Sequence, residues 1–408
     1  MRILIVSQYF WPEQFRINDL AQELKARGHE VSVLTGMPNY PSGKLFPGYS
    51  WWGKKHDDFD GVPVFRTPMF LRRKGRGWQL ALNYFSFVLF GCLLAPWYFR
   101  KHEFDVIFVY EPSPFTVGIP AMLMRHLKKA PMLFWVQDLW PESLSATGAV
   151  QSQKILAAVG KMVRWIYSHC DLILVQSSGF FDPAVRAGAD RTKIRYMPNW
   201  AEMLYQPLTL PSDASERDEV PSDGFVAMFA GNLGAAQSLD TILDAAERLK
   251  EKPVHWVFLG DGRQRTWMEA QVKSRGLSKV HLLGSRPMAS MPAYFSLADV
   301  MLVTLRADPV MTTTIPGKVQ SYLACARPVI GALDGEGAKV IKESGAGFAV
   351  ASGDAQGLAA AVLKMSEMGA DERQRMGDAA LDYYRTYFDR EELVKRLEQW
   401  MEEASSKR

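Results

Sequence analysis

Residues 225–240 read FVAMFAGNLGAAQSLD, and the order of features within this stretch decides the expected fold. The first six residues, Phe225–Ala230, are all apolar, as expected for a buried strand. A turn with Gly231 and Gly234 follows, and a helical pattern then continues through Leu249. A strand, a glycine-containing turn and a helix in this order let backbone amides approach a phosphate group. The alternative is that the glycines serve only the tight strand-to-helix turn.

Apolar runs of the same kind recur in both halves of the chain, with helical stretches between them. They are residues 3–6, 31–35, 62–66, 106–110, 132–136, 172–176 and 194–197, and then 225–230, 256–259, 280–283, 300–303, 328–331 and 347–350. Such runs predict parallel strands covered by helices on both faces. A chain of 408 residues exceeds the size at which a single core stops growing. We therefore expect two doubly wound, Rossmann-like α/β domains that face each other across a deep cleft.

A change of composition marks the expected domain boundary. Residues 205–223 are polar and contain three prolines, a composition that neither packs nor propagates a helix. We interpret this segment as a linker between a first domain, residues 1–204, and a second domain, residues 224–380. Residues 381–408 are charged and helical, and one expectation is that this helix packs back on the first domain.

The overall composition excludes several classes of protein. Hydrophobic residues make up 48% of the chain and charged residues 23%, which is ordinary for a soluble globular protein. A net charge of +4 is too small to indicate nucleic-acid binding. The three cysteines and seven histidines lack the spacing of metal ligands, so we expect no metal site. The apolar run at residues 3–6 is too short for a signal peptide, which predicts a cytoplasmic protein.

One segment departs from this soluble pattern. Residues 78–99 contain no charged side chain, and basic residues flank them on both sides. The flanking residues are Arg72, Arg73, Lys74, Arg76, Arg100 and Lys101. Three interpretations stay open: a buried helix of the first domain, a membrane-spanning helix, and a surface that rests on a membrane. On functional grounds we favour the third, which predicts that residues 72–101 contact an anionic membrane surface.

Two further motifs in the second domain have the chemistry of a phosphate site. A second glycine turn, Gly260–Gly262, ends the run at 256–259 and is followed by Arg263. Pro316 then begins a helical stretch with Lys318 in its first turn. The ammonium group of this lysine would add to the helix dipole in holding a diphosphate. The alternative is an ordinary exposed lysine near a helix end.

Taken together, these motifs resemble the donor-binding domain of family 4 retaining glycosyltransferases of the GT-B fold. The first domain agrees with this resemblance. Its motifs SQYFWPE (7–13), GHEV (28–31), PNYPSG (38–43) and DLWPES (138–143) look like those of the branch that builds bacterial surface polysaccharides. That branch includes colanic acid and N-acetyl-L-fucosamine transferases, and the resemblance covers essentially the whole chain.

The resemblance implies a retaining sugar transfer without a required metal or other cofactor. The C-terminal domain would hold the nucleotide diphosphate, and the N-terminal domain would present the acceptor. The donor would be a uridine diphosphate sugar, with N-acetyl-L-fucosamine or another deoxy sugar as candidates. The acceptor would be a saccharide linked to polyprenyl diphosphate, in O-antigen or capsule synthesis at the inner face of the cell membrane.

This sequence departs from the family pattern in its charged residues. Many relatives have arginine and lysine in the loop after the first strand of this domain, where this chain has Asn232 and Gln237. Lys318, Arg306 or Arg263 could supply the missing positive charge.

A second departure concerns two family glutamates that lie eight positions apart. This chain has Thr313 and Ser321 there, so Ser321 or Gln320 would have to bind the ribose hydroxyls in place of the second glutamate. Glu336, just past a strand end, is a further candidate for the donor pocket. The expected donor-binding residues are therefore Gly231, Asn232, Gly234, Gln237, Gly262, Arg263, Lys318, Ser321 and Glu336.

The transfer reaction also needs a group that accepts the proton of the acceptor hydroxyl, while positive groups stabilise the leaving diphosphate. Asp138 follows the apolar run at 132–136, and Glu142 lies one turn further on, so we expect these two carboxylates to be catalytic. The alternative for Asp138 is a cap on the following helix. Glu111 occupies a similar place after the run at 106–110.

Three rival interpretations of the sequence differ in the motifs that they require. Asp58-Phe59-Asp60 matches the two-aspartate motif of the other major glycosyltransferase fold, but it precedes a strand instead of ending one. An epimerase or oxidoreductase would need a glycine-rich turn after the first strand, and residues 6–10 contain no glycine. A catalytically silent nucleotide-sugar-binding scaffold stays open, because the two family glutamates are absent.

Overall fold

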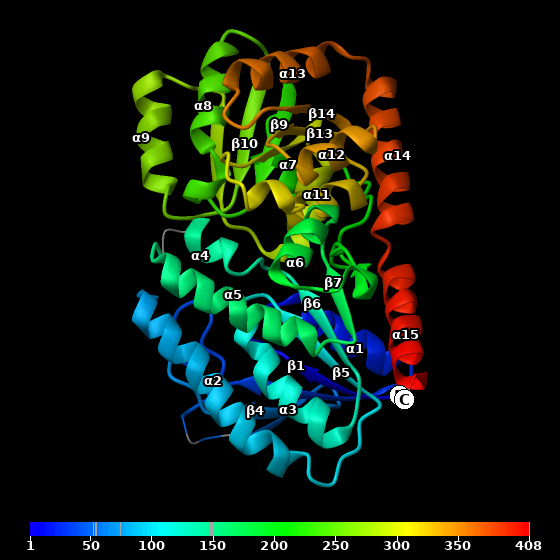
Figure 1. Ribbon diagram of the computed structural model, residues 1–408. Coiled ribbons are helices and arrows are strands. Elements are labelled where there is room, and N and C mark those ends of the chain that lie inside the picture. The colour runs from blue at the N-terminus through cyan, green and yellow to red at the C-terminus, as the bar shows by residue number, and fades with distance from the viewer. Residues whose placement is uncertain (52, 54, 74, 147–149, 408) are drawn as a thin grey trace. The chain divides into compact units, whose positions relative to one another are not determined.

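The structure, a computed structural model, describes residues 1–51, 53, 55–73, 75–146 and 150–407 (Figure 1). It divides into two compact units. Unit 1 comprises Met1–Pro198 and Glu391–Arg408, and unit 2 comprises Asn199–Arg390. Each unit is built around its own sheet, so the expected two-domain α/β architecture is confirmed.

Within the described residues, unit 1 has an eight-stranded sheet in the order β3-β4-β2-β1-β5-β6-β7-β8. The strands are β1 (Arg2–Val6), β2 (Glu30–Gly36), β3 (His56–Phe59), β4 (Val62–Thr67), β5 (Val106–Glu111), β6 (Met132–Val136), β7 (Leu172–Val175) and β8 (Ile194–Tyr196). All neighbouring pairs are parallel except β3 and β4. Every residue of β5 and β6 is buried, as expected for central strands covered on both faces.

The antiparallel strand β3 is a feature that the sequence pattern did not predict. It forms a hairpin with β4 through Asp60 and Gly61, whose φ angles are 50° and 79°. Positive φ at both central residues is typical of a type I′ turn, for which Asp-Gly is a favoured pair. The Gly61 amide donates to Asp58 Oδ1 (2.6 Å), and Gln22 Nε2 donates to Asp60 Oδ2 (2.6 Å). The aspartates of the rival motif therefore hold a hairpin turn together.

Helices of unit 1 lie along both faces of this sheet. They are α1 (Arg16–Ala26), α2 (Gly77–Tyr98), α3 (Gly118–Lys128), α4 (Glu142–Ala146), α5 (Gln153–Ser168), α6 (Phe181–Ala187) and the C-terminal α15 (Arg390–Ser406). Helices α2, α3 and α5 share one hydrophobic core with Val109 and Phe134 of the sheet. Figure 1 shows these three helices beside the strands of unit 1. Helix α15 is tied to unit 1 by Glu398, which accepts from His29 Nε2 (2.7 Å) and from Arg27 (3.2 Å).

Unit 2 has a fully parallel sheet among its described residues, in the order β11-β10-β9-β12-β13-β14. Its strands are β9 (Phe225–Ala230), β10 (Val254–Leu259), β11 (Val280–Gly284), β12 (Val300–Thr304), β13 (Val329–Ala332) and β14 (Gly347–Val350). Its helices are α7 (Glu216–Glu219), α8 (Leu239–Arg248), α9 (Arg265–Arg275), α10 (Met291–Ser296), α11 (Gly317–Ala324), α12 (Glu336–Glu343), α13 (Ala355–Glu367) and α14 (Ala370–Tyr387). Two hydrophobic cores, one on each face, complete this unit.

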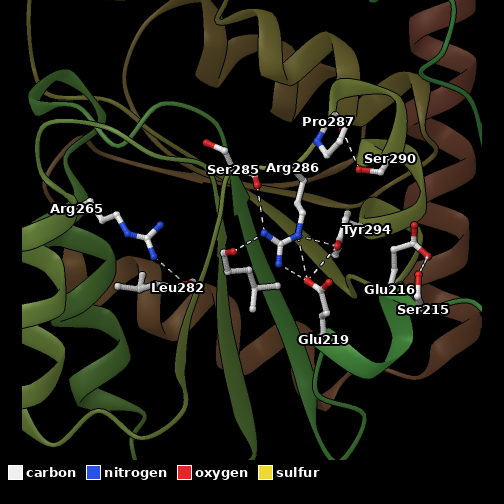
Figure 2. A network of polar contacts seen from close by, with 11 residues as sticks. Ser215, Glu216, Glu219, Arg265, Leu282, Ser285, Arg286, Pro287, Ser290 and Tyr294 are labelled. Atoms are coloured by element: carbon white, nitrogen blue, oxygen red, sulfur yellow. Dashed lines mark hydrogen bonds and ion pairs between the residues drawn. The ribbon is translucent and has the colours of Figure 1, made fainter.

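The segment expected to be a linker, residues 205–223, is part of unit 2. Figure 2 shows the guanidinium group of Arg286 beside Glu219 of α7 and Tyr294 of α10. Arg286 Nε and the Tyr294 hydroxyl donate to Glu219 Oε2 at 3.1 and 3.0 Å. The Tyr205 ring also stacks on Phe295, with centroids 5.8 Å apart. These long-range contacts fix a segment whose local composition indicates a loop.

The C-terminal stretch also differs from the single helix expected over residues 381–408. Helix α14 ends at Tyr387, and α15 begins at Arg390. Phe388 lies between them, fully buried in a core of unit 2. The chain leaves unit 2 at this point, and the domain boundaries of the structure fall at 198/199 and 390/391.

Helix α2 corresponds to the uncharged segment and is only partly buried. Its inward residues include Gln79, Asn83 and Ser86, and Asn83 Oδ1 accepts from Gln8 Nε2 (2.8 Å). Large apolar side chains lie on the other side, among them Leu93, which is 63% exposed. Within the described residues, α2 is the one helix long and apolar enough to cross a membrane, judged by length and composition alone. The polar side chains of α2 therefore face the protein, and its large apolar side chains are exposed.

Candidate donor and acceptor sites

The strand order of unit 2 reverses between β9 and β12, because β10 and β11 lie on one side of this pair and β13 and β14 on the other. Doubly wound sheets bind ligands beyond the carboxyl ends of the strands at such a point. The loops that leave the two strands here are residues 231–238 and residues 305–316. They touch, because the Arg306 amide donates to the Ala236 carbonyl oxygen (3.0 Å).

The two predicted glycine turns pack directly against each other at this point. A β-carbon on Gly260 would lie 1.9 Å from the Gly231 carbonyl oxygen, and one on Gly262 would lie 2.4 Å from the Leu233 carbonyl oxygen. The Leu233 amide also donates to the carbonyl oxygen of Asp261 (2.9 Å). Glycine is thus needed for two loop backbones to meet. A backbone this close to the sheet edge can present its amides to a ligand.

Lys318 stands beside these turns, at the start of α11. Its Nζ donates to Gln237 Oε1 (2.6 Å) and lies 3.8 Å from the centre of the Phe229 ring. A β-carbon on Gly231 would lie 3.3 Å from this Nζ. Burial lowers the pKa of the Lys318 ammonium to about 7, because the charged form has lost its water. An anionic ligand at this point would restore the stability of the charge.

The structure thus brings six of the nine predicted donor-binding residues together. They are Gly231, Asn232, Gly234, Gln237, Gly262 and Lys318. Asn232 belongs to this group because its side-chain amide packs against both Gly234 and Gly262.

The other three donor candidates lie around this group. Arg263 is exposed directly after Gly262. Glu336 is the first residue of α12, and the preceding Gly335 packs against the Thr312 carbonyl oxygen of the loop at 305–316. Ser321 is buried on α11, and its hydroxyl donates to the Gly317 carbonyl oxygen of its own helix (3.3 Å).

Gln320, the other possible replacement for the family glutamate, is buried, and its Nε2 donates to the Asn199 carbonyl oxygen (2.8 Å). It therefore has a structural contact at the start of unit 2.

In unit 1 the strand order reverses between β1 and β5, and Asp138 follows the neighbouring strand β6. Asp138 lines a cavity of about 570 Å³. Helices α2 and α5 and the segments that follow β5 and β6 form its wall. Large apolar side chains in this wall include Trp78, Phe85, Phe115, Trp140, Ile155 and Met162. A carboxylate at the edge of an apolar cavity has the setting of a functional acid or base.

The Asp138 carboxyl has a pKa close to neutral pH. Burial raises its pKa to about 6, against hydrogen bonds from the Ser143 hydroxyl and the Leu139 amide. Its backbone amide donates to Glu111 Oε2 (3.4 Å). Burial, and then the Asp138 charge, raise the pKa of Glu111 well above its ordinary value. Glu142 begins α4 outside the cavity wall, so the structure gives the two predicted catalytic carboxylates different surroundings.

An aromatic cluster at the carboxyl ends of β1 and β2 was not predicted as functional. Tyr9, Phe15 and Tyr40 have ring centroids 5.2 to 5.5 Å apart. Arg72 lies 4.8 Å from the Tyr40 ring centre, and its Nη1 donates to the Tyr9 hydroxyl (3.2 Å). Two of the rings belong to the motifs SQYFWPE and PNYPSG, so the signal was present in the sequence.

Glu13 binds the backbone of the two loops that carry Tyr9 and Tyr40. Its carboxylate accepts from the amides of Phe10 (3.2 Å), Asn39 (2.7 Å) and Tyr40 (2.6 Å). Burial raises its pKa to about 7 despite these bonds. Glu13 thereby ties the loop after β1 to the loop after β2. Within the residues that the structure describes, no group of three or more His, Cys, Asp or Glu side chains could hold a metal ion.

Two family models match successive parts of the chain. Residues 14–200 match the model of the glycosyl transferase 4-like domain, and residues 224–368 match that of glycosyl transferases group 1. The chain is 25% identical over 340 residues to WcaI of Escherichia coli (strain K12), a glycosyl transferase provisionally assigned to colanic acid biosynthesis. That match covers 79% of this chain and 81% of WcaI.

Solved structures show the same fold. Sucrose-phosphate synthase of Thermosynechococcus elongatus has a TM-score of 0.76 at 16% identity, with both chains covered completely. HepE of Anabaena, solved in complex with UDP, has a TM-score of 0.72 at 17% identity, covering 99% of this chain and 100% of that one. The matched family models span most of the sequence, and the two α/β units, each with a mainly or fully parallel sheet, have the GT-B architecture, so this chain belongs to the family 4 glycosyltransferases.

Proposed function

We propose that this protein transfers a sugar from a uridine diphosphate donor to a saccharide linked to polyprenyl diphosphate, with retention of anomeric configuration. N-acetyl-L-fucosamine or another deoxy sugar is the proposed donor sugar, and the product belongs to a surface polysaccharide such as O-antigen or capsule. The observation that carries the proposal is the half-buried Lys318 beside two interlocked glycine turns, at the point where the strand order of unit 2 reverses.

The donor side of the proposal follows from this geometry. Lys318 and the N-terminus of α11 neutralise the diphosphate, while the glycine turns offer their backbone amides. Asn232, Gln237, Arg263, Ser321 and Glu336 are proposed to complete the donor pocket. The similarity to HepE supports uridine as the base, since that structure contains UDP.

Asp138 is the proposed proton acceptor for the attacking hydroxyl, because its raised pKa places it near neutral pH beside a cavity. Glu142, one turn further on, is proposed to assist it electrostatically. Departure of the diphosphate leaves positive charge on the sugar, and the positive groups around Lys318 stabilise the negative charge that develops on the leaving group.

We further propose that α2 rests on the inner face of the cell membrane. Trp78, Leu82, Phe85, Leu89, Leu93 and Trp97 recur every three or four residues and are 40 to 63% exposed, which makes one apolar stripe. Arg73, Arg76, Arg100 and Lys101 are exposed around its ends. An apolar stripe between basic residues suits an anionic bilayer surface. Two more basic residues were expected here: Arg72 is only partly exposed and contacts Tyr9 and Tyr40, and Lys74 lies outside the described residues.

The membrane contact gives a direct prediction. Leu89→Glu combined with Leu93→Glu is expected to lower binding to phosphatidylglycerol vesicles by about a hundredfold, because two exposed leucines lose their apolar contact. Vesicle flotation measures the effect. Leu208→Glu, which changes an exposed leucine of unit 2, serves as the control and should bind like the wild type. Equal binding of the double variant would contradict the proposed orientation of α2.

The transferase proposal is tested by donor binding and turnover. Thermal unfolding should shift upward with one class of nucleoside diphosphate, with or without magnesium. The same donor should then be consumed, with the α or β configuration at the anomeric carbon preserved in the product, as read by NMR. Binding without any turnover would favour the silent scaffold, which the replacement of the family glutamates by Thr313 and Ser321 keeps open.

A further inference from the structure

The cavity beside Asp138 is mainly apolar and is large enough to hold a ligand. Its wall is built mainly of aromatic and aliphatic side chains from α2 and α5, including Leu80, Leu144 and Val159. Its volume of about 570 Å³ lies within the usual range of ligand pockets. Such a wall would leave the hydroxyl groups of a saccharide without hydrogen-bond partners. An aliphatic chain would not.

The cavity is continuous with the apolar stripe of α2. Trp78 and Phe85 belong to the stripe, being 61% and 55% exposed, and both also line the cavity. Ile155 of α5, 51% exposed, lines it from the opposite helix. An aliphatic chain that lies against the stripe could therefore enter the cavity without crossing a polar surface.

Three polar residues also line the cavity, Tyr84, Ser113 and Asp138. Burial raises the pKa of the Tyr84 phenol, and the nearby Arg72 guanidinium opposes that shift. Within the described part of the chain, Arg72 forms no ion pair with a carboxylate, so its charge is open to an anionic ligand.

We infer that this cavity binds the first isoprene units of the acceptor's polyprenyl chain, with Arg72 placed for the diphosphate and Asp138 for the saccharide. The inference rests on the proposed function, from which it takes the polyprenyl-linked acceptor. The apolar wall and the Asp138 carboxyl belong to this cavity, and the Arg72 guanidinium lies near its Tyr84, so the site offers partners for the chain, the sugar and the diphosphate of such an acceptor. The site would thus select the acceptor through its lipid chain as well as through its sugar.

Short prenyl diphosphates test the inference without knowledge of the saccharide. Isothermal titration in detergent-free buffer should show that farnesyl diphosphate binds about a hundredfold more tightly than dimethylallyl diphosphate, because two more isoprene units are buried. Ala81→Trp fills the cavity from the exposed side of α2 and should remove this dependence on chain length. Leu89→Trp, on the same helix but outside the cavity wall, should retain it.

Two more variants separate the parts of the site. Val159→Trp fills the cavity from α5 and should act like Ala81→Trp, which guards against a local effect of either substitution.

Arg72→Gln should weaken the binding of both prenyl diphosphates by the same factor. Dodecyl diphosphate, which has the same head group on a straight chain, should bind more weakly than farnesyl diphosphate in the wild type. Equal binding of the two would overturn the inference in favour of a site for membrane lipids.

The outcome is distinguishable from a failure of the transferase proposal. If UDP binds and turnover occurs but chain length has no effect, the cavity inference fails and the transferase proposal stands. If the prenyl diphosphates show the expected dependence but no nucleotide binds, the transferase proposal fails instead. Equal loss of chain-length dependence in Leu89→Trp would also overturn the inference, because the stripe and not the cavity would then hold the chain.

Discussion

Replacing Lys318 by methionine is expected to lower the affinity for UDP by about a hundredfold or more, because a buried ammonium–phosphate contact is lost. Methionine keeps most of the apolar stem beside the Phe229 ring and removes the charge. Isothermal titration measures the affinity. Lys273→Met, an exposed lysine of α9, is the matched control and should bind like the wild type.

The same lysine sets an expected pH dependence of donor binding. Burial lowers the pKa of Lys318 to about 7, so the free protein loses this charge as pH rises above 7. Because the diphosphate prefers the ammonium form, UDP affinity should fall with rising pH by up to about tenfold per unit. Binding at pH 8 should also take up a proton, seen as a buffer-dependent heat. A wild-type affinity that stays constant from pH 6 to 9 would contradict the role of Lys318.

Stability should respond in the opposite direction. The lysine titrates near 10.5 in an unfolded chain, so between pH 7 and 10.5 the unfolded state binds more protons than the folded state. The contribution of Lys318 to the free energy of unfolding should therefore rise with pH across this window, so the difference in this free energy between the wild type and Lys318→Met should change with pH in favour of the wild type. Chemical denaturation at several pH values measures it and also shows that the variant is folded.

Replacing Asp138 by asparagine is expected to lower kcat by about a hundredfold to a thousandfold, because the proton of the attacking hydroxyl loses its acceptor. UDP affinity should not change, because Asp138 is not among the proposed donor-binding groups. Asp182→Asn, an exposed aspartate in the first turn of α6, is the matched control. Full activity of Asp138→Asn together with an inactive Glu142→Gln would reverse the two proposed roles.

Asp138 and Lys318 together predict the pH profile of the wild type. The carboxylate is ionised above a pKa of about 6, and the lysine is charged below a pKa of about 7. Activity at low substrate concentration should therefore follow a bell with its maximum between these values. The rise on the acid side should disappear in Asp138→Asn, and the fall on the alkaline side should disappear in Lys318→Met.

The strands and the glycine turns were accessible from the sequence because they depend on local pattern. Phe225–Ala230 and Met132–Val136 are strands with the predicted bounds, since continuous apolar runs of this length suit central parallel strands. The positions of Lys318 at a helix start and of Asp138 past a strand end followed from the same reasoning. The Asp-Gly hairpin at Asp60 carried a local signal that the parallel pattern concealed.

The tertiary structure alone decided what these elements face. Composition shows that residues 78–99 are uncharged, but only packing reveals that Gln79 and Asn83 point inward while Leu93 is exposed. Segment 205–223 looks like a linker by its prolines, yet the Arg286–Glu219 ion pair, between residues far apart in the chain, fixes it to unit 2. Local sequence determines which elements form, because their preferences act over a few residues. Pairing, exposure and the shape of a cavity depend on distant residues brought together only by the fold.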